Sequence, residues 1–129
     1  MNWKSCSEHK NDRIFNLLYQ EAERAPMIKK ARHTCAIVYR KRVLAIGHAK
    51  RKTHPIERKW QRKTQSPLYL HAEKDAIIKT INKHGDEILK ECSLYVLRVM
   101  HNGNIGFSKP CESCNDYINF VGIKKVYWS

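Results

Sequence analysis

The chain has 129 residues, a length that suits one domain with a hydrophobic core and is too short for two. Its net charge of +13 is uneven, because residues 1–64 carry 17 Lys and Arg against 5 Asp and Glu, whereas residues 65–129 carry 8 against 7. The N-terminal half is therefore expected to attract a phosphate or another polyanion, unless it is simply a solvated basic surface. No stretch is apolar enough for a membrane span or a signal peptide, so we expect a cytoplasmic protein whose five cysteines are thiols or metal ligands.

Hydrophobic periodicity and turn residues predict elements in the order α-β-β-α-β-α-β. In chain order we expect a helix at 11–25, strands at 35–39 and 43–46, a helix from 71 to about 83, a strand at 94–100, a helix at 111–121 and a strand at 125–128. The last strand, helix and strand should form a right-handed parallel crossover. The expected fold is a single α/β domain over residues 1–129, with three α/β/α layers and a mixed sheet of four to five strands. The polar connection at 49–69 is longer than most loops, so it is either functional or partly disordered.

Two short patterns stand at predicted helix starts. They are His-Ala-Glu at residues 71–73 and Pro-Cys-Glu-Ser-Cys at residues 110–114. A helix N-terminus carries a partial positive charge and unpaired N–H groups, which favour the thiolate form of a cysteine. His71, Cys111 and Cys114 would therefore supply three ligands to a zinc ion. A structural zinc normally takes a fourth protein ligand, whereas here Glu73 lies beside the site and suits a base for a water molecule, which indicates a catalytic zinc.

Together the two patterns match H-x-E…P-C-x-x-C, the signature of zinc nucleobase deaminases. The chain resembles the cytidine/deoxycytidylate deaminase family from about residue 35 to residue 128. The segment RKTHP at 51–55 is similar to small phage-type members, and GIKKVYWS at 122–129 is similar to a closing strand of the family. The resemblance implies a cytidine-deaminase-like fold, a Zn²⁺ cofactor and a hydrolase that acts on C–N bonds of a cyclic amidine.

The resemblance also implies roles for individual residues. The metal would be held by His71, Cys111 and Cys114, and it would lower the pKa of its bound water. Glu73 would carry the proton of that water to the ring nitrogen and then help to expel ammonia. Attack would fall on C4 of cytosine or C6 of adenine, and the backbone N–H of Ala72 would bond the base carbonyl.

The substrate is less well defined by the sequence. Members of the family commonly carry an Asn after the second strand that contacts the sugar, and this chain has His48 and Ala49 there, so His48 is either a substitute or a structural residue. Residues 50–63 hold seven Lys and Arg and one Glu, together with an interleaved tryptophan that could stack on a base, or else be part of a solvated loop. Candidate substrate-binding residues are Ala72, His48, His54, Lys52, Trp60 and Pro110.

Three functions remain open at this stage. The first is a deaminase that converts cytosine to uracil in a dCMP-like nucleotide. The second is a deaminase of single-stranded DNA or RNA, acting on cytosine or adenine through the basic N-terminal half. The third is a non-catalytic, zinc-stabilised protein that binds nucleic acid, against which the presence of Glu73 argues. Family members often form oligomers, so a homo-oligomer is also expected.

Overall fold

The computed structural model describes residues 12–51, 54–60 and 70–129. The helices are α1 (Asp12–Glu21), α2 (Pro55–Trp60), α3 (Ala72–His84) and α4 (Glu112–Val121), with short 3-10 helices at Ala22–Arg24 and Glu87–Glu91. The strands are β1 (Ala31–Tyr39), β2 (Arg42–His48), β3 (Ser93–Met100), β4 (Ile105–Gly106) and β5 (Lys125–Trp128).

The strands form one mixed sheet, as expected from the sequence. Its order is β2-β1-β3-β4, and β5 pairs with β3 on the same side as β4 but nearer the start of that strand. The pairs β1–β2, β1–β3 and β3–β4 are antiparallel, whereas β3 and β5 run parallel. The predicted parallel pairing of β3 with β5 across α4 is therefore confirmed. The connection leaves β3 at its C-terminal end, so α4 starts toward that end of the strand.

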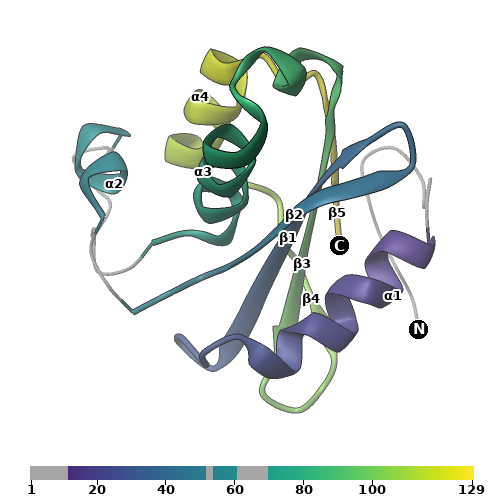
Figure 1. Cartoon of the computed structure of the whole chain (residues 1–129). Helices are drawn as coiled ribbons and strands as arrows, with labels where there is room; N and C mark the ends of the chain where they lie inside the picture. The colour runs from purple at the N-terminus through teal and green to yellow at the C-terminus, as the bar shows by residue number, and fades with distance from the viewer. Residues whose placement is uncertain (1–11, 52–53, 61–69) are drawn as a thin grey trace.

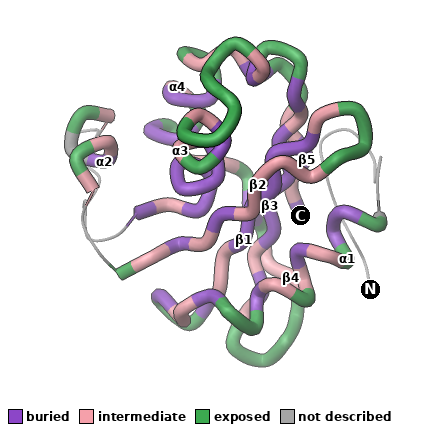
Figure 2. The backbone as a smooth tube through the Cα atoms, in the orientation of Figure 1, coloured by how far each residue is buried: buried purple, intermediate pink, exposed green. Residues whose placement is uncertain are grey.

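Helices cover both faces of the sheet, which confirms the three layers. In Figure 1, α1 lies across one face, while α3 and α4 lie side by side on the other. Side chains alternate along a strand, so Ile37 of β1 packs toward α3 and α4, and its neighbour Ala36 packs toward α1. The buried segments accordingly run through the middle of the tube in Figure 2, with exposed residues on the outer turns.

The structure contains elements that the sequence patterns did not predict. α2 lies inside the polar connection, and it is held by contacts with α4, because the ring of Trp60 is 5.5 Å from that of Tyr117 and 5.1 Å from that of Phe120. β4 is only two residues long. β1 begins at Ala31, four residues before the predicted start. The prediction missed these first residues because they include polar side chains, which are only half buried.

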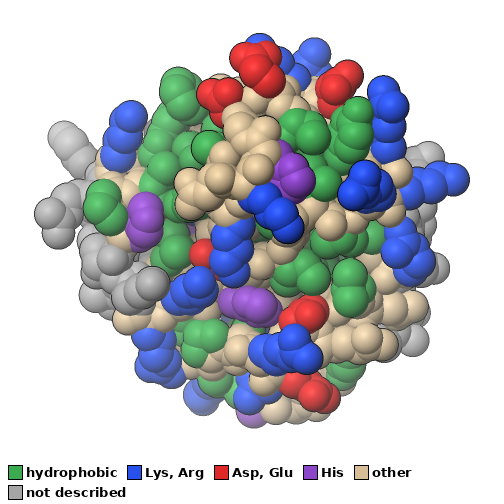
Figure 3. Space-filling view, in the orientation of Figure 1, with side chains coloured by type: hydrophobic (Ala, Val, Ile, Leu, Met, Phe, Trp, Pro, Cys, Tyr) green, Lys and Arg blue, Asp and Glu red, His purple; other side chains and the backbone are tan. Residues whose placement is uncertain are grey.

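The described helices include none that is long and apolar enough to cross a bilayer. Lys and Arg side chains are spread over the face of the molecule shown in Figure 3.

Candidate active site

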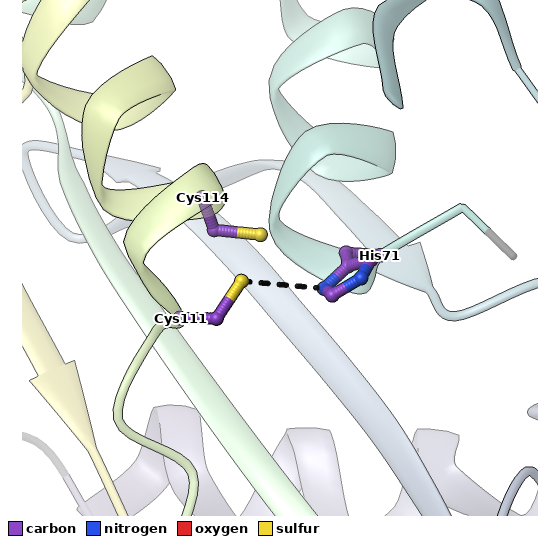
Figure 4. A group of neighbouring side chains, drawn as sticks. All are labelled: His71, Cys111 and Cys114. Atoms are coloured by element: carbon purple, nitrogen blue, oxygen red, sulfur yellow. Dashed lines mark hydrogen bonds between the residues drawn. The ribbon is translucent and has the colours of Figure 1, made fainter. Parts of the chain in front are cut away.

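The site lies where the first turns of α3 and α4 meet. His71 is the residue immediately before α3, and Cys111 is the residue immediately before α4, with Cys114 in the first turn of α4. One nitrogen or sulfur atom of each residue lies within 4.8 Å of the other two, and Nδ1 of His71 is 3.8 Å from Sγ of Cys111. Figure 4 shows the three side chains pointing toward a common space from the two helices. This cluster could hold a metal ion.

Backbone conformation explains how the ligand atoms reach one another. His71 and Cys111 both have extended backbones, with ψ of 149° and 170°, so their side chains project off the ends of the helices rather than along their sides. Both occupy the N-cap position, which Ser, Thr, Asp and Asn usually fill with a side-chain hydrogen bond to the first turn. Neither makes such a bond here, so the imidazole and the thiol are not used to cap their helices.

Electrostatics within the cluster favour a thiolate at Cys111. The hydrogen bond from Cys114 is the main reason why the pKa of Cys111 falls to about 3, although burial acts in the opposite direction. Burial raises the pKa of Cys114 well above its usual range. Burial also lowers the pKa of His71, but the hydrogen bond with Cys111 and the carboxylates of Glu73 and Glu57 outweigh it, so the pKa of His71 is raised.

Glu73 lies beside this cluster in the first turn of α3. Its side chain is buried, with 7% of its surface exposed. Burial is the main cause of a raised pKa of Glu73, which the charge of His71 partly offsets. A raised pKa increases the proton affinity of a carboxyl group, which suits a general acid/base.

A cavity of about 250 Å³ opens onto this cluster and onto Glu73. It is bounded by β1, the end of β2, β3, the start of α3 and the segment that leads into α4, and its lining residues are His33, Ala49, His71, Ala72, Glu73, Arg98, Phe107, Ser108, Lys109 and Cys111. A larger cavity between α4 and β5 is lined by none of the metal-cluster residues. The chemistry therefore belongs to the smaller cavity, where a small molecule would touch Glu73 and the cluster together.

The model of the cytidine and deoxycytidylate deaminase zinc-binding region matches residues 8–129. The chain belongs to this family. It is accordingly a hydrolytic deaminase of the cytidine/deoxycytidylate type with zinc as its cofactor. The donors fit that metal, because imidazole nitrogen and thiolate sulfur are the preferred ligands of Zn²⁺, and the cluster offers three of them at the edge of an open cavity.

Solved structures share the fold of this deaminase. The dCMP deaminase of the cyanophage S-TIM5 in apo form is 23% identical, with a TM-score of 0.55 over 92% of this chain and 83% of that chain. A structure from studies of A-to-I editing by tRNA:A34 deaminases is 23% identical, with a TM-score of 0.55 over 92% and 76%. Guanine deaminase of Bacillus subtilis is 21% identical, with a TM-score of 0.54 over 88% and 57%. No curated protein matches the deaminase in a sequence search.

Hydrogen bonds to Val96 of β3 and to Ser129, the residue after β5, hold the segment that forms the cavity wall before α4. Oγ of Ser108 donates to the carbonyl of Val96 over 2.9 Å and accepts the backbone N–H of Ser129 over 2.8 Å. The backbone N–H of Ser108 donates in turn to the carbonyl of Ser129. These bonds anchor the segment that carries Phe107 and Lys109, of which Phe107 keeps 68% of its surface exposed at the rim of the cavity.

Two lining residues come from neighbouring strands that the sequence patterns did not single out. His33 of β1 pairs directly with Arg98 of β3. Burial is the main reason why the pKa of His33 falls to about 4, and the charge of Arg98 adds to the effect. Nδ1 of His33 makes no hydrogen bond within the described part of the chain. A neutral imidazole and a guanidinium therefore share the wall of the cavity. The sequence marks His33 and Arg98 only as polar residues within β-type segments.

The predicted substrate-binding residues are divided between the cavity and other places. Ala72 lines the cavity. His48 does not, because Nε2 of its imidazole lies 3.8 Å from a carboxylate oxygen of Glu21, on α1 at the other face of the sheet. Ala49, at the position where an Asn was sought, is the residue that faces the cavity. Nδ1 of His54 accepts the backbone N–H of Ile56 over 3.1 Å, so this side chain caps α2.

The remaining predictions concern Trp60, Pro110 and Lys52. The indole of Trp60 packs against α4, as described above. Pro110 is half buried beside Cys111 and is not part of the cavity lining. Lys52 lies outside the described residues.

Proposed function

We propose that this deaminase converts cytosine to uracil in a mononucleotide, a dCMP-like substrate, with His71, Cys111 and Cys114 as the ligands of its zinc ion. When bound, the zinc supplies a Lewis acid that activates a water molecule near neutral pH. Glu73 takes a proton from that water, delivers it to the ring nitrogen and assists the departure of ammonia. The N–H of Ala72 donates to the base carbonyl.

The observation that carries this proposal is that cationic side chains line the same small cavity as Glu73. Arg98 and Lys109 line the same cavity as Glu73 and the metal cluster. A phosphate group needs only one or two such cations, and a guanidinium can bind two phosphate oxygens at once. The volume of about 250 Å³ lies below the range of roughly 300–1,000 Å³ for pockets that take drug-sized ligands, which suits one base with its sugar phosphate.

A second candidate is a deaminase of single-stranded DNA or RNA, acting on cytosine or adenine. It is favoured by Phe107, whose exposed ring at the rim of the cavity could stack on a base next to the target. The excess of Lys and Arg in residues 1–64 would follow a phosphate backbone. Since that excess is more than one phosphate requires, it is the main support for this candidate.

A substrate panel with zinc-loaded protein tests both candidates. Deoxycytidine, dCMP, dCTP, cytosine-containing single strands and a tRNA are offered separately, and release of ammonia or formation of uracil is measured. We expect turnover of dCMP in wild-type protein and a loss of about 10²–10⁴-fold in kcat with Glu73→Gln at unchanged zinc content. Turnover on oligomers alone, falling steeply with added salt, would exclude the mononucleotide proposal.

A second comparison tests the role of the phosphate. We expect Arg98→Met to raise KM for dCMP while changing KM for deoxycytidine far less, because only the former carries a phosphate. Arg24→Met serves as the control, since the Arg24 side chain is 79% exposed and lies outside the cavity. Equal effects of Arg98→Met on both substrates would mean that Arg98 does not bind the phosphate.

A further inference from the structure

Lys74 is completely buried, although lysine is among the residue types that are least often found in protein interiors. It lies in the first turn of α3, one residue after Glu73. Its Nζ is 2.5 Å from Oε1 of Glu57 in α2, and it also donates to Oγ of Ser113 in the first turn of α4. One ammonium group therefore links α2, α3 and α4.

Glu57 extends this link to a metal-cluster residue. Its side chain is 4% exposed, and its second oxygen, Oε2, accepts the backbone N–H of His71 over 2.7 Å. Ser113, which is 3% exposed, lies between Cys111 and Cys114 in the chain. The network of Glu57, Lys74 and Ser113 thus touches the backbone turn of the histidine at one end and the turn of the two cysteines at the other.

Burying two charged groups requires close pairing and further hydrogen bonds, and removal of one partner leaves an uncompensated buried charge. This network meets both requirements within the described residues, since each charged group has a second partner. The network lies next to the residues that carry the metal ligands. Residues that hold metal ligands in position affect the affinity of the site for its metal.

We propose that Lys74 and Glu57 are positioning residues that hold the first turns of α3 and α4 at the spacing needed to bind zinc, and that couple the placement of α2 to the metal. The proposal concerns the zinc site and does not depend on which substrate is deaminated. By linkage, zinc binding should order α2, and release of α2 should weaken zinc binding by the same factor.

The test compares zinc affinity among three single variants and one double variant. Glu57→Gln leaves the ammonium of Lys74 without its counter-ion, Lys74→Met leaves the carboxylate of Glu57 without its own, and Ser113→Ala removes one acceptor while keeping the ion pair. The double variant Glu57→Gln/Lys74→Met removes both charges. Zinc affinity is measured by competition with a chromophoric chelator, and ligand geometry by the visible absorption spectrum of the Co²⁺-loaded protein.

We expect each charge-changing variant to bind zinc about 10–100-fold more weakly with a shifted Co²⁺ spectrum, and the double variant to lose less than the product of the two singles. Hydrogen exchange of α2 should rise when zinc is removed from wild-type protein. The control is Glu87→Gln/Lys90→Met, which removes an exposed ion pair of 3.2 Å in the 3-10 helix before β3. It should change neither the zinc affinity nor the Co²⁺ spectrum.

A folded set of variants with wild-type zinc affinity and Co²⁺ spectrum would overturn the proposal, even if their stability toward urea were lower, because that result would describe a merely structural ion pair. Should Lys74→Met fail to fold, Glu57→Gln and Ser113→Ala decide the question by the same two readouts. The catalytic panel is not needed for this decision, so the proposal about the substrate can fail independently.

Discussion

His33 is half buried in the wall of the cavity and has a cationic neighbour on the adjacent strand. Its pKa falls from an ordinary 6.5 to about 4, so the unfolded chain takes up a proton at a higher pH than the folded protein. The stability that comes from keeping His33 neutral is therefore complete above about pH 6.5, and it is lost as the pH falls toward 4. Substitution of His33 should therefore remove the part of the pH dependence of stability that comes from this residue.

We expect the free energy of unfolding of wild-type protein to fall by up to about 2 kcal/mol more than that of His33→Gln between pH 7 and pH 5. Urea titrations of both proteins at the two pH values, with the zinc content held equal, measure the difference. Parallel pH dependence in the two proteins would show that His33 does not titrate between the folded and unfolded states as its surroundings indicate.

At the scale of single residues, the sequence predicted the cluster better than the cavity around it. His71, Cys111 and Cys114 stand in patterns of fixed spacing, and such spacing can be recognised without knowledge of the fold. His33 and Arg98 carry no such pattern, because they meet only through strand pairing across 65 residues of chain. Lys74 was missed for another reason, since a lysine on a predicted helix is normally assigned to the solvent-facing side.

At the scale of elements, the packing of α3 against β2 depends on Gly47. A Cβ at this position would lie 2.4 Å from the backbone N of Ala76 and 2.5 Å from the carbonyl O of Ala72. Both atoms belong to the backbone of α3 and cannot rotate away. An added methyl group must therefore push α3 off the sheet, and this helix carries His71 at its start.

We expect Gly47→Ala to reduce the free energy of unfolding by about 1–3 kcal/mol or more and to weaken zinc binding as well. Thermal unfolding and chelator competition measure the two effects. Gly106→Ala is the control, because the atoms that its Cβ would meet belong to the flexible side chains of Met100 and Arg98. A Gly47→Ala protein as stable as the Gly106→Ala protein would contradict the close packing of α3 on β2.

Elements were predictable where local sequence and tertiary packing agree. α3 and α4 have apolar periodicity, and each ends at a glycine, Gly85 or Gly122, with positive φ. α2 is too short and too polar to be recognised, and it depends on contacts with α4 and on the buried Glu57. The parallel pairing of β3 with β5 followed from the crossover rule, but the two-residue β4 has no sequence signature of its own.

For the whole molecule, zinc should act as a bridge between α3 and α4. A ligand that binds the folded state alone stabilises it by about 4 kcal/mol when its free concentration is 1,000-fold above Kd. We therefore expect removal of zinc with a chelator to lower Tm by roughly 15 °C in a chain of this size. Calorimetry with and without chelator measures the shift, and re-addition of zinc should reverse it.

Two cysteine variants make this measurement specific. Cys111→Ser should abolish the response of Tm to zinc, because it removes one of the three clustered donors. Cys92→Ser should keep the response, since Cys92 is not one of the clustered donors and its Sγ donates to the carbonyl of Ile88. A zinc-dependent Tm in the Cys111→Ser protein would place the metal at a different site.

The extended residues that precede α3 and α4 reveal a trade-off between activity and stability. Position 71 before α3 and position 111 before α4 would each gain a capping hydrogen bond from Ser or Asp, worth about 1 kcal/mol per helix. Histidine and cysteine forgo that gain at both places. In the absence of zinc, selection for thermal stability alone would thus favour changes at the two positions that the chemistry can least spare. A stabilised variant of this enzyme has to be sought elsewhere in the chain.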